Sequence, residues 1–87
     1  MNALKPHPEI IETPLEGEVV LLDPRNQQMY SLNATGTLVW ESLKRGEYAQ
    51  VAEKLSEAFE VEPTDAQHDA DALLEDLERA GLLVRSA

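Results

Sequence analysis

The feature that most constrains the fold of this 87-residue chain is an abrupt change of residue pattern at Asn33. The residues before it, Gln27 to Leu32, are typical of extended chain, whereas residues 34–44 carry large apolar side chains at helical spacing and end shortly before Gly46. Asparagine is a favoured N-cap because its side chain accepts a backbone N–H of the first helical turn. The junction therefore predicts a strand that leads directly into a helix. A phosphate loop would need several glycines or a lysine here, and the sequence offers a single glycine.

The clearest strand pair lies immediately upstream of this junction. Glu18 to Asp23 and Gln27 to Leu32 flank the tripeptide Pro24-Arg25-Asn26, which suits a three-residue hairpin loop closed by a left-handed Asn26. The first strand is continuously apolar from residue 19 to residue 22, which predicts cover on both of its faces. The second strand is more polar, as expected at a sheet edge.

The N-terminal residues give weaker signals. Glu9 to Thr13 is a short β-branched run that predicts a third strand, and Pro14 and Gly17 are expected to interrupt it. Residues 1–8 contain two prolines and few apolar groups, which predicts a loose tail.

Two further helices are predicted after the first. Apolar residues at i, i+3 and i+4 spacing favour a helix from about Tyr48 to Phe59, and Pro63, in a favoured first position, opens a longer helix that ends at Gly81. Because the strands precede the helices, we expect an α+β fold in which a three-stranded antiparallel sheet is followed by three helices, as in a winged helix-turn-helix. Without an internal repeat or linker, residues 1–87 should form a single domain.

The formal net charge of −10 is concentrated in the second half of the chain, where residues 47–87 contain eleven acidic and three basic side chains. Such a surface repels nucleic acids and anionic lipids, and so disfavours the DNA binding typical of many winged helices. No apolar run approaches the ~20 residues of a membrane span, and the first residues do not resemble a secretory signal. The sequence therefore predicts a cytoplasmic protein that binds neither nucleic acid nor membrane.

Catalytic and metal-binding patterns are scarce. The chain has no cysteine, two histidines and no Ser/His/Asp arrangement with a recognisable spacing. The best cluster of possible metal ligands is His68 with Asp65, Asp69 and Asp71, but a solvated polar helix face explains it more simply. We therefore expect no enzyme activity, no catalytic residue, no metal and no cofactor.

A peptide-binding surface is the remaining class. The edge strand Gln27 to Leu32 carries no charge and has Met29 and Tyr30 as large side chains. Such a strand can accept an added strand through main-chain hydrogen bonds. A merely solvated edge, or one covered by the tail, fits the same residues, so the pattern leaves these alternatives open. The edge could also pair with a second copy, which predicts a monomer or a weak dimer.

Taken in order, the motifs resemble the PqqD family, the pyrroloquinoline quinone biosynthesis protein D group. The resemblance rests on the "LLD" strand and hairpin, the "LN…G…W" junction and the "D…LL…L…GLL" third helix, and covers about Glu18 to Val84. It implies a winged-helix fold that recognises the leader segment of ribosomally made, post-translationally modified peptides. The family resemblance further implies that the leader adds as a strand beside the third strand, in a groove walled by the third helix, and that the protein has no catalytic residues.

The resemblance also implies which residues would bind the leader. The edge strand would supply backbone hydrogen bonds, apolar residues a pocket, and aspartates attraction for leader lysine or arginine. The residues implied on the strand are Gln27, Gln28, Met29, Tyr30 and Ser31. Those implied on one stripe of the third helix are Asp69, Ala70, Leu73 and Asp76.

Within the family, "LNATGTLVW" and "AGLL" look closer to the stand-alone recognition proteins of lasso-peptide clusters. The implied partners are the precursor leader peptide, a leader peptidase and a macrolactam-forming cyclase. The alternative is a peptide chaperone of pyrroloquinoline quinone biosynthesis that presents its precursor to a radical SAM enzyme, although members of that pathway tend to carry an aromatic residue where this chain has Leu82. A more remote alternative is an acidic winged-helix module that binds another protein.

Overall fold

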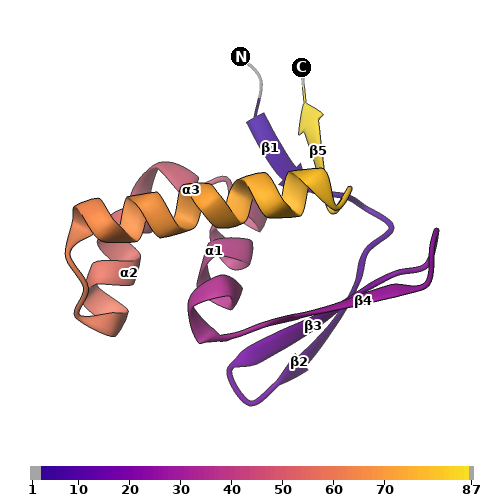
Figure 1. The fold of residues 1–87 in the computed structure, drawn as a ribbon, viewed down its shortest axis with the longest axis horizontal. Helices are drawn as coiled ribbons and strands as arrows, with labels where there is room; N and C mark the ends of the chain where they lie inside the picture. Colours follow the sequence, from indigo (N-terminus) through magenta and orange to yellow (C-terminus); the bar gives the residue numbers. More distant parts are fainter. Residues whose placement is uncertain (1–2, 87) are drawn as a thin grey trace.

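The computed structural model describes residues 3–86, which form two small sheets and three α-helices (Figure 1). In chain order the elements are β1 (Ala3–Pro6), β2 (Ile11–Leu15), β3 (Glu18–Asp23), β4 (Gln28–Leu32), α1 (Ala34–Lys44), the short 3₁₀ helix η1 (Tyr48–Gln50), α2 (Val51–Phe59), α3 (Pro63–Arg79) and β5 (Leu83–Ser86). The antiparallel sheet β2-β3-β4 precedes the three helices, so the predicted α+β class is confirmed. No helix in the described range is long and apolar enough to cross a membrane.

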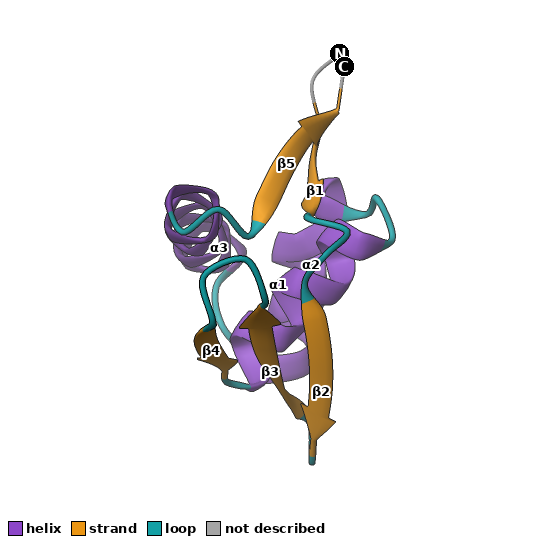
Figure 2. Ribbon diagram, turned by 90° about the vertical axis from the view of Figure 1, so that its right-hand side faces the viewer, coloured by secondary structure: helices purple, strands orange, loops and turns teal. Residues whose placement is uncertain are grey.

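The first described residues form a strand, so the predicted loose tail over residues 1–8 is wrong for residues 3–6. β1 pairs antiparallel with β5 along its whole length, and Figure 2 shows this two-stranded ribbon apart from the larger sheet. The His7 N–H extends the pairing by donating to Leu82 O at 2.9 Å. Residues 1 and 2 lie outside the described range.

β2 begins and ends two residues later than the predicted strand over Glu9 to Thr13. It continues through Pro14, which lies opposite Val19, and it ends at a two-residue turn of Glu16 and Gly17. Both turn residues have positive φ, 45° and 86°, as a tight hairpin turn requires. Proline is tolerated because β2 is at a sheet edge, where one strand N–H can be spared.

The β3–β4 hairpin has a four-residue loop in place of the predicted three-residue one. Asp23 pairs with Gln28, and the left-handed residue is Gln27 (φ 59°), not Asn26. The Asn26 side chain explains the difference, since its Oδ1 accepts the Gln28 N–H at 3.0 Å and shapes the end of the loop. Gln27 therefore belongs to the loop, and the edge strand begins at Gln28.

β3 is buried on one face and half-buried on the other, so the predicted cover on both faces is confirmed in full for one face only. Val19, Leu21 and Asp23 are buried on the face that packs against α1. Val20 and Leu22, on the opposite face, are only half-buried.

α1 occupies the centre of the fold, where it packs against the sheet, β1 and both other helices. Its buried face carries Val39, Trp40 and Leu43, the residues that helical spacing groups on one side. Leu55 of α2 and Leu77 of α3 are buried in the same core. Trp40 is the largest of the fully buried side chains, so α1 is the main apolar support of the sheet.

The junction between β4 and α1 is a capped helix start, as the sequence predicts. Asn33 has an extended backbone conformation, and its Oδ1 accepts the Gly36 N–H at 2.8 Å. Gly36 is buried, and a Cβ added to it would lie 3.3 Å from Leu32 Cβ. The glycine therefore allows the end of β4 to pack closely on the first turn of α1.

Replacing Asn33 with alanine should lower the free energy of unfolding by about 1 kcal/mol, because a backbone N–H of the first turn loses its acceptor. Urea denaturation followed by circular dichroism measures this change. Asn33→Ser, which restores an oxygen at the cap, should recover most of the loss. Equal destabilisation by alanine and serine would show that the cap hydrogen bond contributes little.

Candidate functional site

The outer edge of β4 faces α3 across an open gap. One edge of β4 is paired with β3, and the other pairs with no strand in the part of the chain that the structure describes. Figure 2 shows β4 as the strand of this sheet nearest to α3, yet no Cα atom of β4 comes within 8 Å of a Cα atom of α3. Hydrogen-bonded strands lie ~4.8 Å apart, so the backbone of α3 does not occupy the position beside β4 that an added strand would take.

The end of this gap nearest α1 is a surface hollow of about 480 Å³. Three stretches of chain line it: the end of β4, the first turn of α1 and the middle of α3. The lining residues are Ser31, Leu32, Asn33, Thr35, Gly36, Asp69 and Leu73. We call this hollow, together with the free edge of β4, the edge groove.

A narrower crevice of about 70 Å³ adjoins the hollow, with which it shares Thr35 and Asp69. Its other lining residues are apolar: Leu55, Phe59, Val61 and Ala66. Phe59 and Val61 are 38% and 40% exposed, so two large apolar side chains border this opening without being covered. The crevice can take up an apolar side chain of a ligand that lies in the edge groove.

Three residues proposed from the sequence, Ser31, Asp69 and Leu73, are brought together as walls of the hollow. Tyr30 lies half-buried against the core, on the side of β4 that faces the helices. Met29 points to the opposite face of the sheet and is 67% exposed. The two large side chains of the edge strand therefore face different surroundings.

The other four proposed residues lie outside the hollow. Gln27 is in the β3–β4 loop, and Gln28 starts β4 at the far end of its free edge. Asp76 is exposed further along α3, 3.3 Å from Arg79 Nη1. Ala70 is 1% exposed and packs in the core, so it is not on the surface of the edge groove.

The sequence pattern does not assign the residues at the β4–α1 junction to the site, although Asn33, Thr35 and Gly36 line the hollow. The run of small, uncharged residues from 33 to 36 is the available signal. Because β4 runs directly into α1, the helix start that this run specifies also forms one wall of the hollow.

The α3 wall of the edge groove is acidic. Asp69 borders both the hollow and the crevice, and none of the described residues that line them is a lysine or arginine. Asp69 is one of six acidic residues of α3, which also carries one arginine; the other five, which do not line the hollow, are Asp65, Asp71, Glu75, Asp76 and Glu78. This wall attracts cationic groups of a ligand and repels anionic ones.

Polar contacts occupy the opposite flank of α3. Tyr48 Oη donates to Asp71 Oδ1 at 2.6 Å, and Gln67 Nε2 donates to the same oxygen at 2.9 Å. Burial, and then the Asp71 carboxylate, raise the pKa of Tyr48. In the described range no three His, Cys, Asp or Glu side chains are placed to hold a metal ion, and this includes the neighbours of His68.

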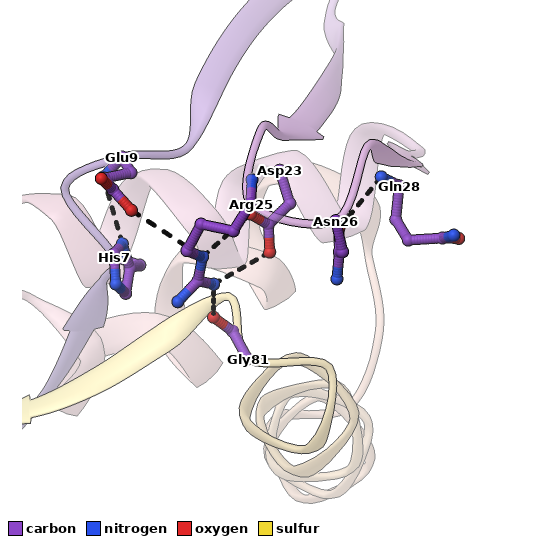
Figure 3. Close-up of polar contacts among 7 residues, drawn as sticks. All are labelled: His7, Glu9, Asp23, Arg25, Asn26, Gln28 and Gly81. Carbon is purple, nitrogen blue, oxygen red and sulfur yellow. Dashed lines mark hydrogen bonds and ion pairs between the residues drawn. The ribbon is translucent and has the colours of Figure 1, made fainter.

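The far end of the edge groove, at the β3–β4 loop, contains a buried carboxylate (Figure 3). Asp23 is 1% exposed and accepts three hydrogen bonds from Arg25, from its backbone N at 3.0 Å and from Nε and Nη2 at 2.9 Å. Arg25 Nη2 also donates to Gly81 O at 2.6 Å, and Arg25 Nε lies 4.0 Å from Glu9 Oε2. The hydrogen bonds from Arg25 lower the pKa of Asp23 and outweigh the opposing effect of burial.

Acid should destabilise the protein partly through Asp23. Because the folded-state pKa of this group is lowered, the ionised carboxylate contributes stability above its unfolded pKa of ~3.9, and the contribution is lost as the pH falls through the folded-state value. The melting temperature of Asp23→Asn should therefore fall less steeply below about pH 4 than that of the unchanged protein. Calorimetry from neutral to acidic pH measures both slopes, and parallel slopes would contradict this assignment.

The face of the larger sheet that points away from the helices is apolar and exposed. Ile11, Leu22 and Met29 lie side by side across the three strands, and Ile11 is 50% exposed. Leu15, on the same face, is 54% exposed. Clustered exposed apolar side chains are typical of surfaces that contact other proteins.

Comparison with known proteins gives a family and two similar structures. The family model for coenzyme PQQ synthesis protein D (PqqD) matches residues 18–83. TbiB1 in complex with the TbiA(beta) leader peptide has a TM-score of 0.83 at 22% identity, over 91% of this chain and 93% of that chain. Lasso peptide synthetase B1 complexed with the leader peptide has a TM-score of 0.84 at 35% identity, over 93% of this chain and 96% of that chain. No curated protein matches the sequence.

Proposed function

The chain belongs to the PqqD family, and on this basis we propose that it binds the leader segment of a ribosomally synthesised precursor peptide and presents it to modifying enzymes. The leader adds as a strand to the free edge of β4 and lies in the edge groove. The observation that carries this proposal is the unpaired edge of β4, which has no α3 backbone beside it and leads into the hollow. The role is one of binding and presentation, without catalysis.

The two faces of an added strand meet different surfaces. Because successive side chains of a strand alternate, one set of leader side chains points toward the hollow, where Leu73 and Asp69 lie. The other set lies beside Met29 on the outer face of the sheet. Apolar leader residues suit the crevice next to the hollow, and leader lysine or arginine suits Asp69 and Asp76.

The similarity to lasso peptide synthetase B1 supports a lasso-peptide pathway over the quinone pathway. The proposed partners are then a leader peptidase and a macrolactam-forming cyclase. A leader in the edge groove leaves the outer face of the sheet open, and its exposed Ile11, Leu15 and Met29 give a modifying enzyme an apolar surface to contact.

An NMR titration of the labelled protein tests the proposal. The probes are synthetic peptides. Each corresponds to the N-terminal segment of a precursor peptide that is encoded by a short gene beside the gene for this chain. Binding at micromolar strength, about 8 kcal/mol, should shift the amides of Gln28 to Ser31 and of Asp69 to Asp76 most strongly. A folded protein that responds to none of these peptides would overturn leader binding.

Leu73 and Leu74 form a matched pair for testing the position of the groove. Both are half-buried on α3, but Leu73 lines the hollow and Leu74 does not. Leu73→Ala should weaken leader binding about tenfold, equivalent to ~1.4 kcal/mol, because an apolar wall of the groove is removed. Leu74→Ala should leave the affinity within about twofold of the unchanged protein.

Calorimetric titration of both variants gives the affinities, and circular dichroism confirms that each is folded. A larger loss of affinity in the Leu74 variant would place the leader on the other flank of α3.

A further inference from the structure

The two ends of the edge groove are closed in different ways. At one end β4 continues covalently into α1, and α1 packs against α3. At the other end the β3–β4 loop meets the turn after α3, where Arg25 Nη2 donates to Gly81 O (Figure 3). In the described range no other hydrogen bond or ion pair joins this loop to α3 or to the turn that follows it.

The loop side of this link has a fixed geometry. Asp23 binds the Arg25 guanidinium at two points and also accepts its backbone N–H, so the carboxylate sets the direction of Nη2. A two-point contact between a guanidinium and a carboxylate is strongly directional. Separating the pair would leave the Asp23 carboxylate buried without a partner, which is unfavourable.

The helix side of the link is equally well defined. The Gly81 N–H donates to Glu78 O and the Leu82 N–H donates to Leu77 O, both at 3.0 Å, which is the Schellman arrangement of a helix end. Gly81 has a φ of 80°, a conformation that glycine adopts without steric cost. The carbonyl that accepts Arg25 therefore belongs to a fixed end of α3.

We propose that Asp23, Arg25 and Gly81 form a bridge that sets the distance between the edge of β4 and α3, so that the free protein already holds the edge groove at the spacing that an added strand needs. This inference rests on the proposed leader binding. It adds Asp23 and Arg25 as positioning residues. They lie outside the hollow and affect leader binding by holding the edge groove at the right spacing.

Loss of the bridge should weaken leader binding by reducing the fraction of molecules with a correctly spaced groove. The apparent Kd for the leader is inversely proportional to that fraction. If only about a tenth of the molecules have a correctly spaced groove, the leader binds about tenfold more weakly. Arg25→Ala removes the bridge. Arg25→Lys keeps the charge but has no planar fork with which to contact Asp23 and Gly81 together, so its affinity should be intermediate.

The test combines two readouts on the full chain. The first is the affinity for the leader peptide that the unchanged protein binds in the NMR titration. The second needs no leader: a nitroxide is attached at Ala72→Cys, an exposed position of α3 in a chain without native cysteine, and its relaxation effect on the amides of Gln28 to Tyr30 is measured. This second readout depends on the distance between α3 and β4. A change in global stability alone does not alter that distance in the folded protein.

Arg45→Ala is the matched control, because it removes the same charge from an exposed residue at the C-terminal end of α1. It should change neither readout. If Arg25→Ala fails to fold because Asp23 is left buried without its partner, the double variant Asp23→Asn/Arg25→Ala removes that charge and serves in its place.

The bridge is supported if a folded bridge variant binds the leader about tenfold more weakly and shows altered relaxation at β4. It is overturned if either readout stays at the level of the Arg45 control. Failure of the unchanged protein to bind any leader is a different outcome, because it removes the proposed function itself.

Discussion

The direct connection of β4 to α1 is the constraint on which the rest of the structure depends. Asn33 caps the helix immediately after the strand ends, so no flexible loop separates the two elements. Leu32 and Gly36 then pack closely, and the buried Trp40 face of α1 supports the sheet from one side. Since α1 also packs against α3, this junction fixes how β4 and α3 approach each other at the α1 end of the edge groove.

An edge strand that binds a peptide must be well ordered and yet leave its main chain free. β4 meets both needs because one of its faces packs on the helices, and because only one of its edges is paired with another strand. Tyr30 and Leu32 pack toward the helices and hold the strand in place, while β3 pairs with one edge only. α3 divides its surface in the same way: Ala66, Ala70 and Leu77 enter the core, and Asp69 and Leu73 remain at the gap.

The local parts of this design are readable from the sequence. The Asn33 cap, the stop at Gly46 and the first position of Pro63 all depend on residues within a few positions of each other, and the structure confirms them. β1 escapes prediction because its partner β5 lies at the other end of the chain, and four residues carry too little pattern to reveal it. The predicted hairpin loop is one residue too short. The Asn26 side chain accepts the Gln28 N–H, and the left-handed conformation falls on Gln27 in place of Asn26.

In the candidate site, too, the features set by neighbouring residues can be predicted from the sequence, and those set by distant contacts cannot. Helical spacing groups Ala70 and Leu73 on one apolar face, but it does not show that Ala70 is buried in the core while Leu73 stays at the edge groove. The Arg25–Gly81 contact joins residues 56 positions apart, and the sequence around Arg25 reads as an ordinary turn. Contacts of this range depend on how the hairpin and α3 meet in space, which no local pattern encodes.

An unpaired strand edge also invites pairing with a second copy, and the charge of α3 opposes this. A second copy would bring its own acidic α3, which carries six carboxylates and one arginine, to the neighbourhood of such a contact. Like charges in such a contact repel, whereas a cationic peptide is attracted by the same residues. The acidic wall thus attracts a cationic strand and repels an acidic one, although β4 itself has none of the lysine residues that guard many other sheet edges.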